Sequence, residues 1–200
     1  MVHVFGDSHS KMFRLIDGAV IHHTGTHTMY RIGRDGGPIE LNHVQPDDIC
    51  VWTYGEIDCR CHVTRIAELE GRDVPSVCEP LAQCYCAAML NAPGAVKVIA
   101  SVMPAGVDET EYLPMHGTLK ERVAATRILN GYLRDQCRRA GIRFLDFHHA
   151  FAAPDGSLDC WRSDGKVHAA DKCFWRVDAA FRCLMQRVNA EQHREYEGAD

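Results

Sequence analysis

The sequence predicts a single α/β domain, a three-layer α/β/α sandwich in which helices cover both faces of a parallel sheet of about five strands. Short β-rich runs alternate with longer stretches of helical periodicity along the whole chain, which is the pattern of successive βα units. The chain has 200 residues, 46% of them hydrophobic, and this is enough to bury a sizeable core. We expect one domain over residues 1–190 and a polar tail over residues 191–200.

Local signals divide the chain into strands and helices. Apolar runs that end at Gly, Pro or Asp predict the strands, and apolar residues at helical spacing predict the helices. The predicted strands are residues 2–5, 19–22, 48–54, 96–102 and 142–147, and the predicted helices are residues 9–17, 59–69, 75–90, 119–140 and 170–188. Residues 105–117 lack a period and predict a long loop, and residues 189–200 predict a frayed end.

Charge and hydropathy exclude several classes of protein. The formal net charge is −5 and the basic residues are scattered, so the sequence lacks the basic patch that nucleic-acid binding requires. No apolar run is long enough for a membrane span, and no secretory leader pattern precedes the first strand. We therefore expect a cytoplasmic protein that acts on a small molecule or a glycan, without nucleic-acid or membrane partners.

Ten cysteines raise the question of a disulfide framework or a metal site, and their spacing favours neither. In a reducing compartment thiols are the default, and the pairs at residues 59–61 and 84–86 have C-x-C spacing, which suits neither a thioredoxin-like motif nor a common zinc site. His22, His23 and His27 lie close together, but no carboxylate accompanies them in a metal-binding motif. We expect no metal and no cofactor, and we expect the cysteines to be small buried residues.

The clearest candidate for chemistry is Ser8, in the run GDSHS at residues 6–10. It follows the first predicted strand and precedes the first predicted helix, so it lies at the carboxyl edge of the sheet, where clefts form. Backbone N–H groups at the start of that helix can hold a developing oxyanion. The alternative is that Ser8 or Asp7 is only the N-cap of the helix, a position that both residue types favour.

Four segments together resemble the sequence blocks of the SGNH (GDSL-like) hydrolase superfamily. They are GDSH at residues 6–9, Gly25 after the second strand, YGEIDCR at residues 54–60, and Asp164 with His168 before the last helix. The blocks occur in the family's order and cover nearly the whole chain. The resemblance implies the three-layer, flavodoxin-like architecture that the alternation of strands and helices also predicts.

The resemblance also implies a serine-esterase site. Ser8 is then the nucleophile, His168 takes its proton, and Asp164 orients and stabilises the imidazolium. Backbone N–H groups of Ser8 and Gly25 bind the oxyanion of the tetrahedral intermediate.

The third block departs from the family pattern. Ile57 stands where the family has an asparagine that donates a side-chain N–H to the oxyanion. Arg60, positioned by Glu56 or Asp58, is a candidate substitute, and Gly55 begins the altered segment. The alternative is that Asp58 and Arg60 form a structural ion pair.

The fourth block departs in its spacing. Three residues separate Asp164 from His168, where the family usually has two. A backbone carbonyl or Asp171 is therefore an alternative partner for the ring of His168. Asp7 and His9, on either side of the nucleophile, are further candidates for contact with the substrate.

The function implied by the resemblance is ester hydrolysis through an acyl-serine intermediate, and we expect the removal of O-acetyl groups from a carbohydrate. Four aromatic side chains are candidates for stacking on a sugar, or else belong to the core: Trp52, Tyr54, Trp161 and Trp175. Two alternatives stay open. One is an acyl- or glycosyltransferase acting on a saccharide, which the altered third block favours, and the other is a non-catalytic glycan-binding module.

Overall fold

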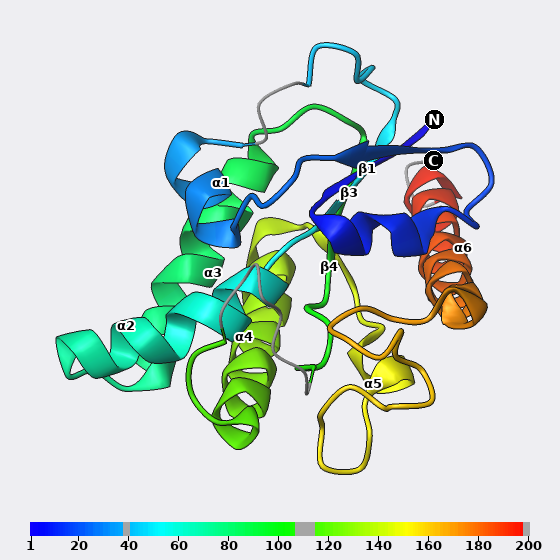
Figure 1. Ribbon diagram of the computed structural model, residues 1–200. Coiled ribbons are helices and arrows are strands. Elements are labelled where there is room, and N and C mark those ends of the chain that lie inside the picture. Colours follow the sequence, from blue (N-terminus) through cyan, green and yellow to red (C-terminus); the bar gives the residue numbers. More distant parts are fainter. Residues whose placement is uncertain (38–40, 107–114, 198–200) are drawn as a thin grey trace.

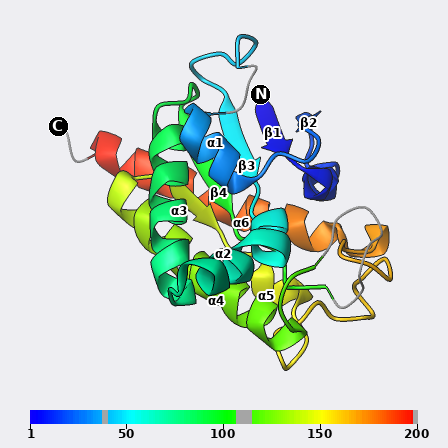
Figure 2. The same cartoon turned by 60° about the vertical axis from the view of Figure 1, so that its left-hand side comes forward.

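The structure, a computed structural model, describes residues 1–37, 41–106 and 115–197 and confirms the predicted three-layer fold (Figure 1). A five-stranded parallel sheet lies between two layers of helices. The strands are β1 (Val2–Gly6), β2 (Ala19–His23), β3 (Ile49–Thr53), β4 (Val96–Ala100) and β5 (Arg143–Leu145), in the order β2-β1-β3-β4-β5. Figure 2 shows β2 at the edge of the sheet beside β1.

The helices divide between the two faces of the sheet. One face is covered by α1 (Met29–Asp35), α2 (Val63–Glu70), α3 (Val74–Leu90) and α4 (Leu119–Ala140). The other face is covered by the 3-10 helix η1 (Ser8–Phe13), α5 (His148–Phe151), the 3-10 turn η3 (Asp171–Cys173) and α6 (Trp175–Glu197). A π-helical turn, η2 (Asp58–His62), leads into α2.

Alternation along the central strands builds two separate cores. Val4, Val51 and Val98 are aligned across β1, β3 and β4 and pack against η1, α5 and α6. The residues that follow them, Phe5, Trp52 and Ile99, are aligned in the same way and pack against α1, α3 and α4. Because successive side chains on a strand point to opposite faces, each strand buries both of its faces.

The strand order creates a switch point at β1. From β1 the chain passes to β2 on one side, and β3 then returns to the other side of β1. Connections that diverge in this way leave a crevice at the carboxyl ends of the two central strands, and open α/β sheets bind ligands there. Ser8 follows β1 at this position.

Several elements differ from the sequence-based prediction. The first helix, predicted over residues 9–17, is the shorter 3-10 helix η1. Ala19 pairs with Val2, so the chain must return the whole length of β1 before β2 begins. A 3-10 helix rises about 2.0 Å per residue against about 1.5 Å for an α-helix, so it covers that distance in fewer residues.

Other differences concern the ends of elements and two short helices. The fifth strand, predicted over residues 142–147, has only three residues, and α5 follows it. Helix α6 continues to Glu197, so the frayed end predicted from residue 189 is wrong up to that residue. Helix α1 was missed, although Thr28 caps its first turn and Gly36 ends it. Most of the loop predicted over residues 105–117 lies outside the described residues.

Candidate active site

The turn that carries Ser8, the candidate nucleophile, begins where β1 ends. Asp7, rather than Ser8, is the N-cap of η1, because its Oδ1 accepts a hydrogen bond of 2.8 Å from the His9 backbone N–H. The Ser8 hydroxyl is therefore not occupied by capping and points to a partner elsewhere in the chain. In Figure 1 the dark-blue η1 lies near the orange segment that precedes α6, where that partner is found.

The structure brings together the three residues that the resemblance assigns to catalysis. Ser8 Oγ lies 2.7 Å from His168 Nε2, and His168 Nδ1 lies 3.2 Å from Asp164 Oδ2. Asp171, the alternative partner of the ring, instead forms an exposed ion pair of 2.8 Å with Arg14. The arrangement is a hydroxyl, an imidazole and a carboxylate in sequence, which is the geometry of a serine nucleophile with an oriented base.

A tight turn explains how the unusual spacing still places Asp164 on the ring of His168. The Asp164 N–H donates to the His168 carbonyl at 2.9 Å, and Asp164 Oδ1 accepts from the N–H groups of Lys166 and His168. Gly165 has a φ of +87°, which most side chains avoid. The turn therefore accommodates the additional residue without separating the carboxylate from the imidazole.

The environment of His168 keeps its imidazole neutral. Burial, followed by the charges of His9 and Lys11, lowers its pKa to about 4, and Asp164 opposes this shift only in part. A neutral ring with its Nδ1 proton directed at Asp164 presents a lone pair on Nε2 to the Ser8 hydroxyl. His168 is thus in the correct state to act as a base from mildly acidic pH upward.

His9 does not face outward to a substrate through its ring nitrogens. Its Nδ1 lies 2.9 Å from Asp7 Oδ1 and its Nε2 lies 3.1 Å from the Val167 carbonyl oxygen. Burial lowers its pKa, but the charge and hydrogen bond of Asp7, the charge of Glu56 and the Val167 carbonyl raise it to about 9. The protonated ring can donate to both acceptors, so it joins the turn that carries Ser8 to the segment that carries His168.

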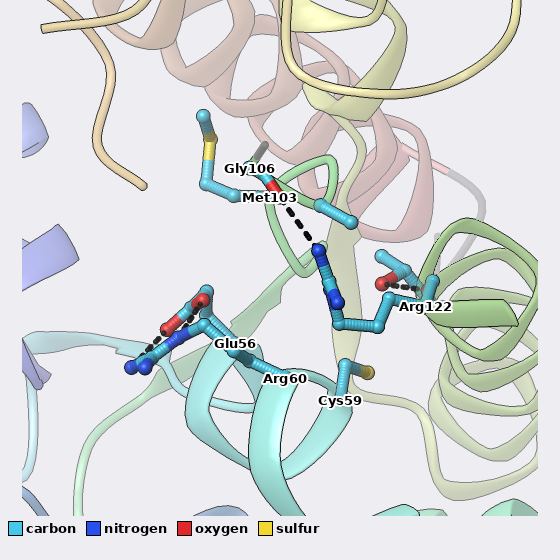
Figure 3. A pocket seen from close by; sticks show the side chains of 8 residues that line it. Glu56, Cys59, Arg60, Met103, Gly106 and Arg122 are labelled. Carbon is cyan, nitrogen blue, oxygen red and sulfur yellow. Dashed lines mark hydrogen bonds and ion pairs between the residues drawn. The ribbon is translucent and has the colours of Figure 1, made fainter. Parts of the chain in front are cut away.

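The altered third block is occupied by internal contacts. Arg60 Nε and Nη2 donate to Glu56 at 2.6 and 3.2 Å, and both side chains are buried (Figure 3). The alternative of an ion pair between Asp58 and Arg60 is wrong, because Arg60 pairs with Glu56. Asp58 instead accepts hydrogen bonds from the N–H groups of Met29 and Tyr30 at the start of α1, at 2.7 and 3.2 Å.

Gly25 and Gly55 follow β2 and β3, the two strands on either side of β1. Gly25 follows β2 with a φ of +71°, and the preceding Thr24 donates its N–H to the Gly6 carbonyl at 2.9 Å. This bond holds the segment with Gly25 beside the turn with Ser8. Gly55 has a φ of +110°, and a Cβ there would lie 2.7 Å from the Met29 side chain, so its role is close packing.

Comparison with solved structures identifies proteins that have the same fold. A carbohydrate acetylesterase from Sinorhizobium meliloti superposes with a TM-score of 0.61 at 12% identity, covering 94% of this chain and 98% of that one. A GDSL-like lipase from Bacteroides thetaiotaomicron gives a TM-score of 0.58 at 12% identity, covering 94% of this chain and 88% of that one. The chain has the SGNH hydrolase fold.

A third structure of similar fold is an acetyl xylan esterase, with a TM-score of 0.54 at 12% identity, covering 92% of this chain and 98% of that one. No protein-family model matches the sequence, and no curated protein matches it. The agreement with SGNH hydrolases is therefore one of fold, and the catalytic roles of individual residues stay predictions that rest on the geometry.

Two small cavities formed by the described residues lie close to the candidate site. A cavity of about 10 Å³ lies beside Asp7 and His9, and a second of about 10 Å³ lies between η2, the segment after β4 and α4 (Figure 3). Each holds little more than one water molecule. A groove of about 620 Å³ lies between α1, α2 and α3, and neither Ser8 nor His168 lines it.

The remaining candidates separate by burial. All ten cysteines are free thiols; seven are buried as expected, whereas Cys84, Cys160 and Cys183 are exposed, which corrects the expectation for those three. Cys59 lines the small cavity, and burial raises its pKa well above the usual value, so it is not poised as a nucleophile.

In the part of the chain that the structure describes, no helix is long and apolar enough to cross a membrane.

Proposed function

We propose that the protein hydrolyses an ester at Ser8, and that its substrate is an O-acetylated carbohydrate. The observation that carries the proposal is the chain of contacts from Ser8 Oγ through His168 to Asp164, at 2.7 and 3.2 Å, at the switch point of the sheet. Hydroxyl, base and orienting carboxylate come from opposite ends of the sequence and meet at one edge of the sheet, which supports a catalytic assembly.

The geometry suits acyl transfer in two steps. Ser8 Oγ attacks the acyl carbonyl while His168 Nε2 takes the hydroxyl proton, and the N–H groups of Ser8 and Gly25 stabilise the oxyanion. The C–O bond of the ester then breaks, and the proton passes from His168 to the departing alcohol. A water molecule, deprotonated by the same nitrogen, attacks the acyl-serine and releases the acid and the free hydroxyl of Ser8.

One exposed aromatic side chain supports a carbohydrate as the alcohol. Trp161 is 80% exposed and lies on the segment that also carries Asp164 and His168. An exposed indole offers a flat apolar face for a sugar ring. By contrast, Trp52 and Tyr54 are buried and belong to the core. Acetylesterases among the proteins of similar fold point to the same class of substrate.

Internal contacts weaken the case for a transferase. That alternative rested on new charges at residues 55–60, available for a charged or sugar-linked donor. Glu56 and Arg60 pair with each other, and Asp58 caps α1, so these contacts account for the charges without a substrate. Product analysis separates the two reactions, because hydrolysis releases free acid without a saccharide acceptor.

The direct test is a serine-reactive phosphonate probe, read by intact mass. Wild-type protein should gain one probe per chain, and Ser8→Ala should gain none while also losing esterase turnover by about 10³-fold or more. Ser76→Ala, on α3, is the matched control and should label like the wild type. Labelling of Ser8→Ala, or no labelling of folded wild-type protein, would contradict the proposal and favour the glycan-binding module.

The substrate class has its own test. Trp161→Ala should raise the KM for an acetylated oligosaccharide several-fold and leave the hydrolysis of a small acetyl ester unchanged, because only the sugar reaches the indole. An equal effect on both esters would mean that Trp161 does not bind the alcohol.

A further inference from the structure

Three histidines from separate segments meet beside the edge of the sheet. His3 lies on β1, His22 lies on β2, and His43 lies on the segment before β3. One ring nitrogen from each lies within 4.8 Å of those of the other two. The cluster is on the sheet face of Phe5, whose ring stacks on His22 with centroids 4.5 Å apart, and Phe5 packs on the α1 and α3 side. It is therefore on the opposite face from η1 and α6.

The separations between the nitrogens suit a metal ion. His3 Nδ1 lies 2.9 Å from His22 Nε2, and His22 Nε2 lies 3.3 Å from His43 Nε2. Imidazole nitrogens bind Zn²⁺ at about 2.0–2.1 Å, which in a tetrahedron places neighbouring ligands roughly 3.3 Å apart. The three nitrogens are thus close to the spacing that one ion requires.

A carboxylate behind the cluster orients the ring of His3. His3 Nε2 lies 3.1 Å from Asp48 Oδ2, and Asp48 is itself held by the amino terminus and by the Gln45 N–H, each at 2.7 Å. In the tautomer whose Nε2 proton is directed at Asp48, the Nδ1 lone pair of His3 faces the cluster. In zinc sites a carboxylate commonly accepts a hydrogen bond from the second nitrogen of a histidine ligand, and this bond orients the ring.

We propose that His3, His22 and His43 bind a divalent transition-metal ion of the zinc type, with Nδ1 of His3 and Nε2 of the other two as ligands. The burial of the three residues decreases from His3, which is buried, to His43, which is exposed. The fourth position of a tetrahedral ion would therefore face solvent and take water. The ion would join β1, the edge strand β2 and the segment before β3, and the site is independent of the proposed esterase function.

Zinc titration of the whole protein tests the site. Wild-type protein should bind Zn²⁺ at a site that His22→Gln and His43→Gln each weaken by at least about 10-fold, because each variant removes one of three ligands. His43 is exposed, so His43→Gln should fold normally. His23→Gln is the matched control, because His23 follows His22 but points to the other face of β2. The affinity of this variant for Zn²⁺ should equal that of the wild type.

Cobalt provides a second readout that separates this site from the exposed thiols. Co²⁺ bound by three imidazoles and water should give a tetrahedral ligand-field absorption without a thiolate charge-transfer band. That spectrum should disappear in His22→Gln and persist in His23→Gln. The proposal is overturned if wild-type protein binds neither ion, or if His22→Gln and His43→Gln bind them as the wild type does.

Discussion

Two histidines lie side by side in this protein, with ring centroids 4.9 Å apart, and they are held in opposite protonation states. His168 faces a hydroxyl on one side and a carboxylate 33% exposed on the other, and its pKa falls to about 4. His9 lies between a buried carboxylate and a backbone carbonyl, and its pKa rises to about 9. At neutral pH the ring of His168 is uncharged and the ring of His9 is a cation.

The comparison shows that partners, rather than burial alone, set the charge of an imidazole. Burial lowers the pKa of both rings. His9, however, has a hydrogen-bond acceptor at each ring nitrogen, and one of them is the carboxylate of Asp7. Because Asp7 is buried, water screens its charge only weakly, and that charge raises the pKa of His9. The resulting positive charge then acts on its neighbour and lowers the pKa of His168 further. In the proposed esterase, His9 is therefore a positioning residue, since it joins the turn that carries Ser8 to the segment that carries His168 and lowers the pKa of His168.

Removal of the carboxylate behind His168 should have the largest effect. Asp164→Asn should lower kcat for ester hydrolysis by roughly 10²–10⁴-fold, because the ring loses the group that fixes its tautomer and stabilises its charge. Steady-state kinetics on a chromogenic acetyl ester measure this effect. Asp171→Asn is the matched control and should change kcat less than about twofold, since Asp171 pairs with Arg14 at the surface. A similar loss of kcat in both variants would mean that Asp164 has no specific role in catalysis.

Removal of the cation should move the pH profile. In wild-type protein the acid limb of kcat/KM should lie near pH 4, the pKa of His168. In His9→Gln the limb should move up by roughly one to two pH units, because a charge about 5 Å away no longer opposes protonation. Asp7→Asn, which leaves His9 without its anion, should move the limb in the same direction if His9→Gln folds poorly. An unchanged limb in both folded variants would mean that the charge on His9 does not reach the base.

The same cation should contribute to stability in a defined pH window. The pKa of His9 is raised on folding, so its contribution is complete below about pH 6.5 and is lost as the pH rises through about 9. Between pH 6.5 and 9.5 the free energy of unfolding of wild-type protein should fall by roughly 3 kcal/mol more than that of His9→Gln. Urea unfolding at a series of pH values gives the difference, and parallel curves would contradict a charged His9.

The smallest effect should come from the second positive charge near His168. Lys11 is exposed on η1, and it lowers the pKa of His168 less than His9 does. Lys11→Gln should raise the acid limb of kcat/KM by only a few tenths of a pH unit, and salt should abolish that difference because water and ions screen exposed charges. A shift as large as that of His9→Gln would reverse the order of the two cations.

Local signals in the sequence were sufficient for much of the fold. Helix α4 has the predicted bounds, because Thr118 and Glu121 form a capping box at its start and Gly141 takes the left-handed conformation at its end. The central strands β1, β3 and β4 were found because each is an apolar run buried on both faces. Helix η1 was predicted too long, since its length depends on where β2 begins in space.

The sequence by itself determined the fold class, the position of Ser8 after the first strand, and the candidate partners Asp164 and His168, because these follow from short patterns along the chain. Only the tertiary structure decided that Asp58 caps α1, that His9 joins Asp7 to the Val167 carbonyl, and that His22 meets His3 and His43 rather than His23 and His27. Each of these contacts joins residues that the strand order brings together in space. Their separation along the sequence does not predict how close they lie in the folded chain.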